Sequence, residues 1–371
     1  MKSDFFPYSL AYENNPIFPL YQKTFFHELI FAWRKCIASF EGVEDLMGIS
    51  HDSLKPFFHI PEISANLLIF LKEDSTEGDL QLARNIIRQE AKKFFSGGKE
   101  TLTAFQAHTI PGTNILLGSS EQTAHISRQP AHPSYDIKNI HSLFGSVDEI
   151  EWQRLYGKSF SIIKKVAPGF FHEMQEILSK IVPFGISKGS HNSCSYPTII
   201  GVIYASYPVE YDEPEIAVLE ALIHEYNHNK IHLIMRVDQL ILNDKQTIYY
   251  SPYRPDARHI QGIYLGLHAM VATYYVTLLC LKEGIITKES QFFRKTIGYI
   301  LKNQLSINTL KRYGKFTSLG TELFEDMLGV HELSLDILKS IDIDKDVLRV
   351  CREHTRDHFY RAKASNRILY Y

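Results

Sequence analysis

The sequence has few of the features that mark secreted, membrane-bound or nucleic-acid-binding proteins. Its 371 residues include four cysteines and no CxxC pair, which is typical of reduced thiols in a cytosolic protein and gives no support to a four-cysteine zinc site. The formal net charge of -2 lacks the basic excess that draws a protein to a nucleic-acid backbone. We therefore expect neither DNA nor RNA as a partner.

Long apolar runs are missing as well. The first residues contain charges and a proline where an export signal needs an unbroken apolar stretch, so we expect a cytoplasmic protein. The longest nearly apolar run, 266–281, is shorter than the roughly 20 residues of a membrane span, and it contains a histidine. This run is typical of a buried helix, and we expect no membrane partner.

Composition and periodicity predict a folded α+β protein that is predominantly helical. Hydrophobic residues make up 44% of the chain and charged residues 22%, which are values of a soluble globular protein. Apolar spacing predicts helices over 24–42, 77–98, 147–182 with a break near Pro168, 258–283, 288–312, 321–341 and 344–363. A hairpin is predicted within 99–118 and a strand over 195–208.

These elements predict a metal-bearing helical core with a small antiparallel sheet next to the helix that contains His224 and His228. A mixed α/β region over 1–190, with a substrate-binding role, would precede a mainly helical catalytic region over 191–371, and the two can also form one continuous domain. The polar, proline-bearing stretch 124–136 is typical of a loop at a substrate mouth. As an edge strand, 195–208 would hold an extended peptide by backbone hydrogen bonds.

The most informative residues are His224-Glu225-Tyr226-Asn227-His228, an H-E-x-x-H sequence. On a helix, His224 and His228 lie one turn apart on the same face, so both imidazoles can reach one divalent ion. Glu225 would then act close to the metal, and in hydrolases with this motif the glutamate takes a proton from metal-bound water. Asp212 as N-cap, with Pro214 in the first turn, predicts that the helix begins just upstream.

A catalytic metal usually has a third protein ligand. His232 is eight residues from His224, about 12 Å along the helix axis, which is too far for one ion. Ile231 and Ile234 occupy the glycine and histidine positions of the longer HExxHxxGxxH motif, which excludes a metzincin.

Two other residues are candidates for the third ligand. His268, in the apolar helix predicted to face the motif, is the better one. Glu322 is its rival, because a glutamate on a later helix is the third ligand in thermolysin-like zinc peptidases.

Between the two predicted metal-bearing helices lies the segment SPYRPDAR, residues 251–258. Its prolines restrict the backbone and help to fix the side chains of Ser251, Arg254 and Arg258. Because arginine binds carboxylates in a bidentate manner, we interpret this segment as a clamp for an anionic cosubstrate. The alternative is a solvated loop in which an arginine pairs with Asp256.

HEYNH, SPYRPDAR and the following GIYLGLHA together resemble the family of HExxH-motif putative peptide-modification proteins that accompany ribosomally made peptide natural products. The match covers roughly residues 197 to 280. The resemblance implies an Fe(II)- and 2-oxoglutarate-dependent hydroxylase that uses O2 to oxidise the β-carbon of residues in a precursor peptide.

The resemblance also implies roles for individual residues. His224, His228 and His268 would hold iron, Arg254 or Arg258 would bind the distal carboxylate of 2-oxoglutarate, and Glu225 would orient a ligand or water. Spacing alone leaves two alternatives: a zinc metallopeptidase with Glu225 as general base, and a non-catalytic peptide-binding protein with a structural metal.

Overall fold

The computed structural model describes most of the chain, with several gaps. The described residues are 17–38, 49–58, 61–71, 75–95, 108–118, 149–188, 191–197 and 199–365. The stretch 124–136, which we expect to be a loop at a substrate mouth, lies outside them.

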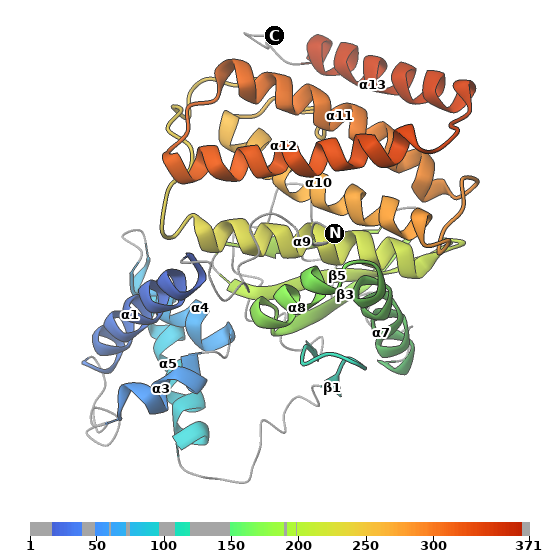
Figure 1. Cartoon of the computed structure of the whole chain (residues 1–371). Helices are drawn as coiled ribbons and strands as arrows, with labels where there is room; N and C mark the ends of the chain where they lie inside the picture. The colour runs from blue at the N-terminus through green and yellow to red at the C-terminus, as the bar shows by residue number, and fades with distance from the viewer. Residues whose placement is uncertain are drawn as a thin grey trace.

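Four N-terminal helices form a hydrophobic cluster of their own (Figure 1). They are α1 (Ile17–Ile37), α3 (His51–Phe58), α4 (Pro61–Ile69) and α5 (Glu77–Phe95). Their core contains Trp33 and Phe57, whose rings meet edge to face with centroids 5.7 Å apart. Arg236, which follows α9, ties α1 to the rest of the molecule through an ion pair of 3.1 Å with Glu28. The helices predicted over 24–42 and 77–98 correspond to α1 and α5.

A small mixed sheet follows, with the strand order β1-β2-β3-β5-β4. Its strands are β1 (His108–Thr109), β2 (Leu116–Leu117), β3 (Lys180–Lys188), β4 (Ser193–Tyr196) and β5 (Ile199–Val209). β1 and β2 form the predicted hairpin around Gly112, which has a positive φ of 78°. The antiparallel sheet that we predict is wrong in part, because β3 pairs in parallel with both β2 and β5.

Alternate residues of β5 face two different cores. Ile203 and Ala205 join the main hydrophobic core beside the motif helix, whereas Val202 and Tyr204 belong to a smaller cluster that includes Ala65 of α4. Burial on both faces explains why this stretch is continuously apolar rather than alternating. β5 lies between β3 and β4, so the prediction of 195–208 as an edge strand is wrong.

Within the described residues, two helices lie between β2 and β3, and five follow β5 (Figure 1). The first two are α7 (Glu149–Val166) and α8 (Pro168–Ile177), which divide at the predicted break. The later ones are α9 (Pro214–Ile234), α10 (Ile260–Lys282), α11 (Gln291–Tyr313), α12 (Ser318–Lys339) and α13 (Lys345–Ser365). The helix predicted over 147–182 ends too late, because Lys180 already begins β3, where strand pairing overrides the local pattern.

The main core contains side chains on both sides of residue 190. Ile110, Phe160 and Ile181 pack in the same hydrophobic cluster as Leu222 and Met327. The division into 1–190 and 191–371 stays a prediction. Within the described residues, the N-terminal helices are the part that has a separate core.

α10 is long and apolar enough to cross a membrane, with a mean hydropathy of 1.5 over its most apolar window. Within the protein, however, 72% of that window is buried. α10 contacts α9, α11 and α12, and in Figure 1 it lies between α9 on one side and α11 and α12 on the other. The described residues are thus compatible with a soluble protein, and the cytoplasmic location stays a prediction.

Candidate functional site

The H-E-x-x-H residues lie in the middle of α9 and line a cavity of about 640 Å³. The other walls come from β4, from the segment 251–258, and from α10 and α11. The helix begins at Pro214 with Glu213 as its N-cap, so the predicted cap at Asp212 is one residue off. Glu213 is fixed instead by a hydrogen bond that it accepts from the Ser290 hydroxyl.

Asn229, directly after the motif, fixes α9 against the sheet. Its side-chain carbonyl accepts a hydrogen bond of 2.8 Å from the backbone nitrogen of Gly201, and its amide nitrogen donates to Val202 O at 3.3 Å. Gly201 has a φ of 84°, and a Cβ there would lie 2.8 Å from Ile177 O, so only glycine fits this approach. The register of the motif against β5 is therefore fixed by hydrogen bonds.

The two motif histidines point at one another. Their Nε2 atoms are 3.1 Å apart, and the rings are nearly perpendicular at 87°. Two nitrogens that each bind one ion at 2.0–2.1 Å are themselves separated by about 3 Å, so the pair fits two ligands of one metal. Without a metal, the same distance permits an N–H···N hydrogen bond between the rings.

Burial keeps both imidazoles neutral, which is the form that binds metal. The pKa of His224 is lowered to about 4, first by loss of solvent and then by the charges of Lys295 and Arg254. The pKa of His228 is lowered well below its ordinary value by the same loss of solvent and by neighbouring histidines and Arg254. Protons therefore compete weakly for these nitrogens at neutral pH.

His268 does not line this cavity. It is buried on α10, where it hydrogen-bonds the backbone of Asn227, and its Nδ1 has no hydrogen-bond partner. It is still close enough for its charge to lower the pKa of His228. Among the described residues no three His, Cys, Asp or Glu side chains form a group that could hold a metal ion, so the structure brings together two of the three predicted ligands.

The other third-ligand candidates also lie outside the cavity. Glu322 is exposed near the start of α12. His232 stacks on His228 with ring centroids 6.3 Å apart, and burial lowers its pKa to about 4. The stacking agrees with the expectation that His232 follows His228 on the same face without sharing its ion.

Glu225 is a buried carboxylate whose two oxygens are both engaged. Ser193 Oγ donates to Oε1 at 2.8 Å and Ser195 Oγ donates to Oε2 at 2.7 Å, both from β4. Burial raises the pKa of Glu225 to about 7, and the two serine hydrogen bonds and Arg254 oppose that rise. β4 thus orients the motif glutamate, a contact that no local sequence pattern indicates.

The segment 251–258 forms one wall of the cavity, as predicted for a clamp, but its two arginines differ. The Arg258 side chain is 33% exposed, and its Nε lies 2.6 Å from Asp256 Oδ2, which is the ion pair that we considered as the alternative. Arg254 is exposed at the cavity wall and has no carboxylate within 4.0 Å among the described residues. Ser251 is buried and also lines the cavity.

Gly266 of α10 sets the position of this segment. A Cβ at Gly266 would lie 2.9 Å from Cδ2 of Tyr253, so the glycine leaves room for the tyrosine ring. The Tyr253 hydroxyl then donates a hydrogen bond of 2.7 Å to Asn303 Oδ1 on α11. The clamp segment is thus held between α10 and α11.

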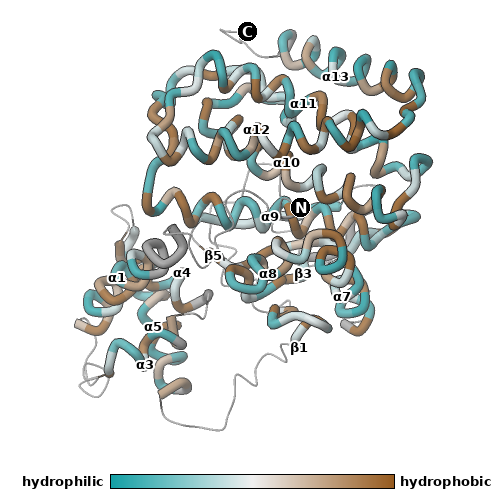
Figure 2. Tube along the Cα trace, in the orientation of Figure 1, coloured by the Kyte–Doolittle hydropathy of each residue, from teal (hydrophilic) through white to brown (hydrophobic). Residues whose placement is uncertain are grey.

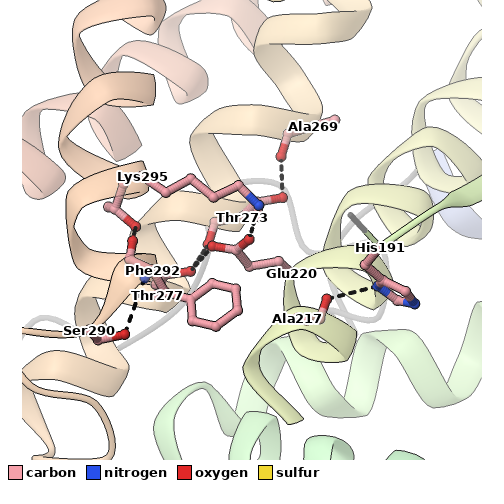
Figure 3. A network of polar contacts seen from close by, with 10 residues as sticks. His191, Ala217, Glu220, Ala269, Thr273, Thr277, Ser290, Phe292 and Lys295 are labelled. Carbon is pink, nitrogen blue, oxygen red and sulfur yellow. Dashed lines mark hydrogen bonds and ion pairs between the residues drawn. The ribbon is translucent and has the colours of Figure 1, made fainter. Parts of the chain in front are cut away.

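Sequence reasoning missed an ion pair in the cavity wall (Figure 3). Lys295 Nζ lies 2.5 Å from Glu220 Oε2, and Thr277 Oγ1 donates to Oε1 at 3.4 Å. The Glu220 side chain is 5% exposed, whereas that of Lys295 is 45% exposed. Glu220 precedes His224 by one helical turn, and that spacing is the one sequence signal that could have pointed to it.

Within the described residues β4 is one of the two edge strands of the sheet, and it lines the cavity with Ser193, Cys194 and Ser195. The strand predicted next to the motif is present as β5. The edge position that we expect for it is occupied by β4 instead. One side of β4 pairs with β5, and no described strand pairs with its other side, where an extended chain could bind.

The chain matches no protein-family model and no curated protein sequence. What it does is therefore inferred from the site.

Proposed function

We propose that this protein is an Fe(II)- and 2-oxoglutarate-dependent hydroxylase that acts on the β-carbon of residues in a ribosomally made precursor peptide. The observation that carries the proposal is the pair of Nε2 atoms 3.1 Å apart in a cavity that also contains Arg254 and Lys295. Bound iron would use O2 and 2-oxoglutarate to insert one oxygen atom into a C–H bond, releasing succinate and CO2.

His224 and His228 would hold the metal. His268 does not line the cavity, but it stays our proposal for the third ligand, because its Nδ1 lacks a hydrogen-bond partner and it lies close enough to His228 to influence its pKa. Glu225 would orient the neighbouring ligand or water, since two serines already engage both of its oxygens.

The cavity supports a dicarboxylate cosubstrate. Arg254 and Lys295 both lower the pKa of His224, so both cations lie within electrostatic reach of the proposed metal site. Arg254, without a carboxylate partner among the described residues, is the better choice for a bidentate contact, and Ser251 lines the same cavity. Arg258 is the weaker choice because Asp256 neutralises it.

The position of β4, at the edge of the sheet and in the cavity wall, supports the proposal that the substrate is a peptide. Its free edge could pair with an extended chain by backbone hydrogen bonds and place one residue of that chain in the cavity.

The test is a metal and cosubstrate titration on anaerobically purified protein. We expect about one Fe(II) per chain and calorimetric binding of 2-oxoglutarate that requires the iron. Arg254→Gln should weaken that binding by roughly 10-fold or more, while Arg312→Gln, a matched change at the end of α11, should not. Iron-independent binding, or equal binding by the two variants, would contradict the proposal.

A zinc metallopeptidase is the second candidate, because Glu225 lies beside His224 and lines the same cavity, as a general base would. Glu225→Gln separates the two functions. A peptidase would keep its zinc and lose peptide cleavage, whereas the hydroxylase would keep oxygen-dependent succinate formation with weaker metal binding.

A further inference from the structure

A second cavity lies beside the first, between α11 and α13, and has a volume of about 670 Å³. Lys295 and Tyr299 line both cavities. We call the second one the α11–α13 groove and define it by Arg294, Gly298, Lys302, Val350, His354 and Arg361. Because the two cavities share wall residues, the groove adjoins the cavity that contains the motif histidines.

Cations dominate the walls of the groove. Arg294 and Lys302 come from α11, and Arg361 comes from α13. The lining contains one carboxylate, Asp346, which already pairs with Arg349 at 3.2 Å. The groove therefore carries a positive charge that its own acidic group does not offset.

Two of these cations have no carboxylate partner among the described residues. Lys302 lies over the ring of Tyr299, with Nζ 4.5 Å from the centroid, and burial lowers its pKa. Arg294 donates to a backbone oxygen, that of Glu289, at 3.3 Å. The charges of Lys302 and Arg361 also help to lower the pKa of His358 in the same groove. A partly buried ammonium without a counterion favours the arrival of an anion.

The groove also has an apolar part and open space. Val350 is 40% exposed there, although most of the valines of this chain that the structure describes are more buried. Next to it, a Cβ at Gly298 would meet nothing within 4 Å. Figure 2 shows α13 alternating between hydrophobic and hydrophilic residues along its length. A chain with acidic side chains and some apolar ones would match a groove lined by cations and by Val350.

We propose that the α11–α13 groove binds an acidic segment of the peptide substrate, next to the residue that is modified in the neighbouring cavity. This inference rests on the proposed function, because it is the adjoining candidate site that makes a peptide the expected occupant. Glutamate and aspartate side chains of the segment would pair with Arg294 and Lys302.

The experiment measures binding rather than turnover. The probe is a fluorescein-labelled octaglutamate peptide, titrated with the full chain and followed by fluorescence anisotropy at low salt. Gly298→Glu places a carboxylate in the groove and should weaken binding by about 5-fold or more. Gly329→Glu is the matched control, since Gly329 is also a helical glycine with open space around its Cβ, and it lies on α12 away from both cavities.

A second pair of variants reverses charge instead. Arg294→Glu combined with Lys302→Glu should weaken binding by on the order of 10-fold, whereas Arg352→Glu with Arg356→Glu, on the exposed part of α13 outside the groove, should change it little. Far-ultraviolet circular dichroism checks that each variant is folded. Equal affinity for the groove and control variants would overturn the proposal.

Two further measurements distinguish peptide binding from nucleic-acid binding, and distinguish failure of the groove inference from failure of the hydroxylase proposal. A single-stranded oligonucleotide of equal charge that competes as well as octaglutamate would assign the groove to nucleic acid and overturn the peptide assignment. Iron-dependent binding of 2-oxoglutarate by Gly298→Glu should equal that of the unmodified chain. If octaglutamate binding fails while cosubstrate binding persists, the groove inference is wrong and the hydroxylase proposal stands. If cosubstrate binding fails in every variant, the hydroxylase proposal is the one that is wrong.

Discussion

The two ends of α9 each carry an ion pair of 2.5 Å, and the surroundings of the two pairs differ. Near the C-terminal end, Lys230 pairs with Glu173 of α8, and the two side chains are 4% and 1% exposed. Near the N-terminal end, Glu220 pairs with Lys295, and the lysine is 45% exposed at the cavity. The first pair is sealed in the core and holds helices together. In the Glu220–Lys295 pair the ammonium is exposed at the cavity, where it can also contact an incoming carboxylate. The same kind of ion pair therefore stabilises the core near one end of α9 and contributes to the candidate site near the other.

Breaking the sealed pair should have the largest effect. Lys230→Met leaves the Glu173 carboxylate buried without its counterion, and we expect a loss of about 3–5 kcal/mol in the free energy of unfolding. Urea denaturation followed by circular dichroism measures it. The double variant Lys230→Met with Glu173→Leu should recover most of the loss, and an unchanged stability of the single variant would mean that the pair is not sealed.

Breaking the Glu220–Lys295 pair at the cavity should reduce stability less than breaking the Lys230–Glu173 pair, and it should also weaken cosubstrate binding. Lys295→Met leaves the buried Glu220 carboxylate with the hydrogen bond from Thr277 and beside a partly solvated cavity, so we expect a loss of about 1–3 kcal/mol, smaller than for Lys230→Met. Iron-dependent affinity for 2-oxoglutarate should fall by roughly 3- to 10-fold, since one of the two cations near His224 is gone. Lys288→Met, at an exposed lysine before α11, is the control. A larger stability loss at Lys295 than at Lys230 would reverse the comparison.

α9 also contains histidines whose pKa values are lowered in the folded state. In the unfolded chain they titrate near 6.5, and in the folded protein His224 and His232 titrate near 4, so the unfolded state binds more protons between these values. Stability is therefore fully present above pH 6.5 and is lost as the pH falls towards 4. Near pH 5.5, His232→Gln should reduce the slope of the unfolding free energy against pH. The reduction should correspond to up to about one proton fewer taken up on unfolding. An identical slope would show that His232 is not protected by folding.

The smallest effect is expected at the serines of β4. Ser195→Ala removes one of the two hydrogen bonds to Glu225, which should cost about 1 kcal/mol and weaken metal binding by a few-fold. Ser193→Ala should act in the same direction, and Ser334→Ala on α12, which does not line the cavity, should not. If Ser195→Ala left metal affinity unchanged, Glu225 would not act through its serine contacts.

Much of the fold could be predicted because local patterns determine it. The breaks at Pro168 and Gly112, the long helices after residue 258 and the burial of the apolar run 266–281 all follow from spacing and from residues with restricted or unusual backbones. The strand β3 could not be predicted in this way. Its residues Lys180, Ile181 and Val182 suit a helix as well as a strand, and pairing with β5 decides between them.

The sequence by itself determined the histidine pair, because a helix places residues four apart on one face whatever surrounds it. It also determined that arginines lie near the motif, since the segment 251–258 is short and rigid. Only the tertiary structure decided that β4 engages Glu225, that Asp256 neutralises Arg258, that Lys295 enters the cavity and that His268 stays outside it. These contacts join residues far apart in the chain, and their distances depend on how α9, α10 and α11 pack, which no local pattern encodes.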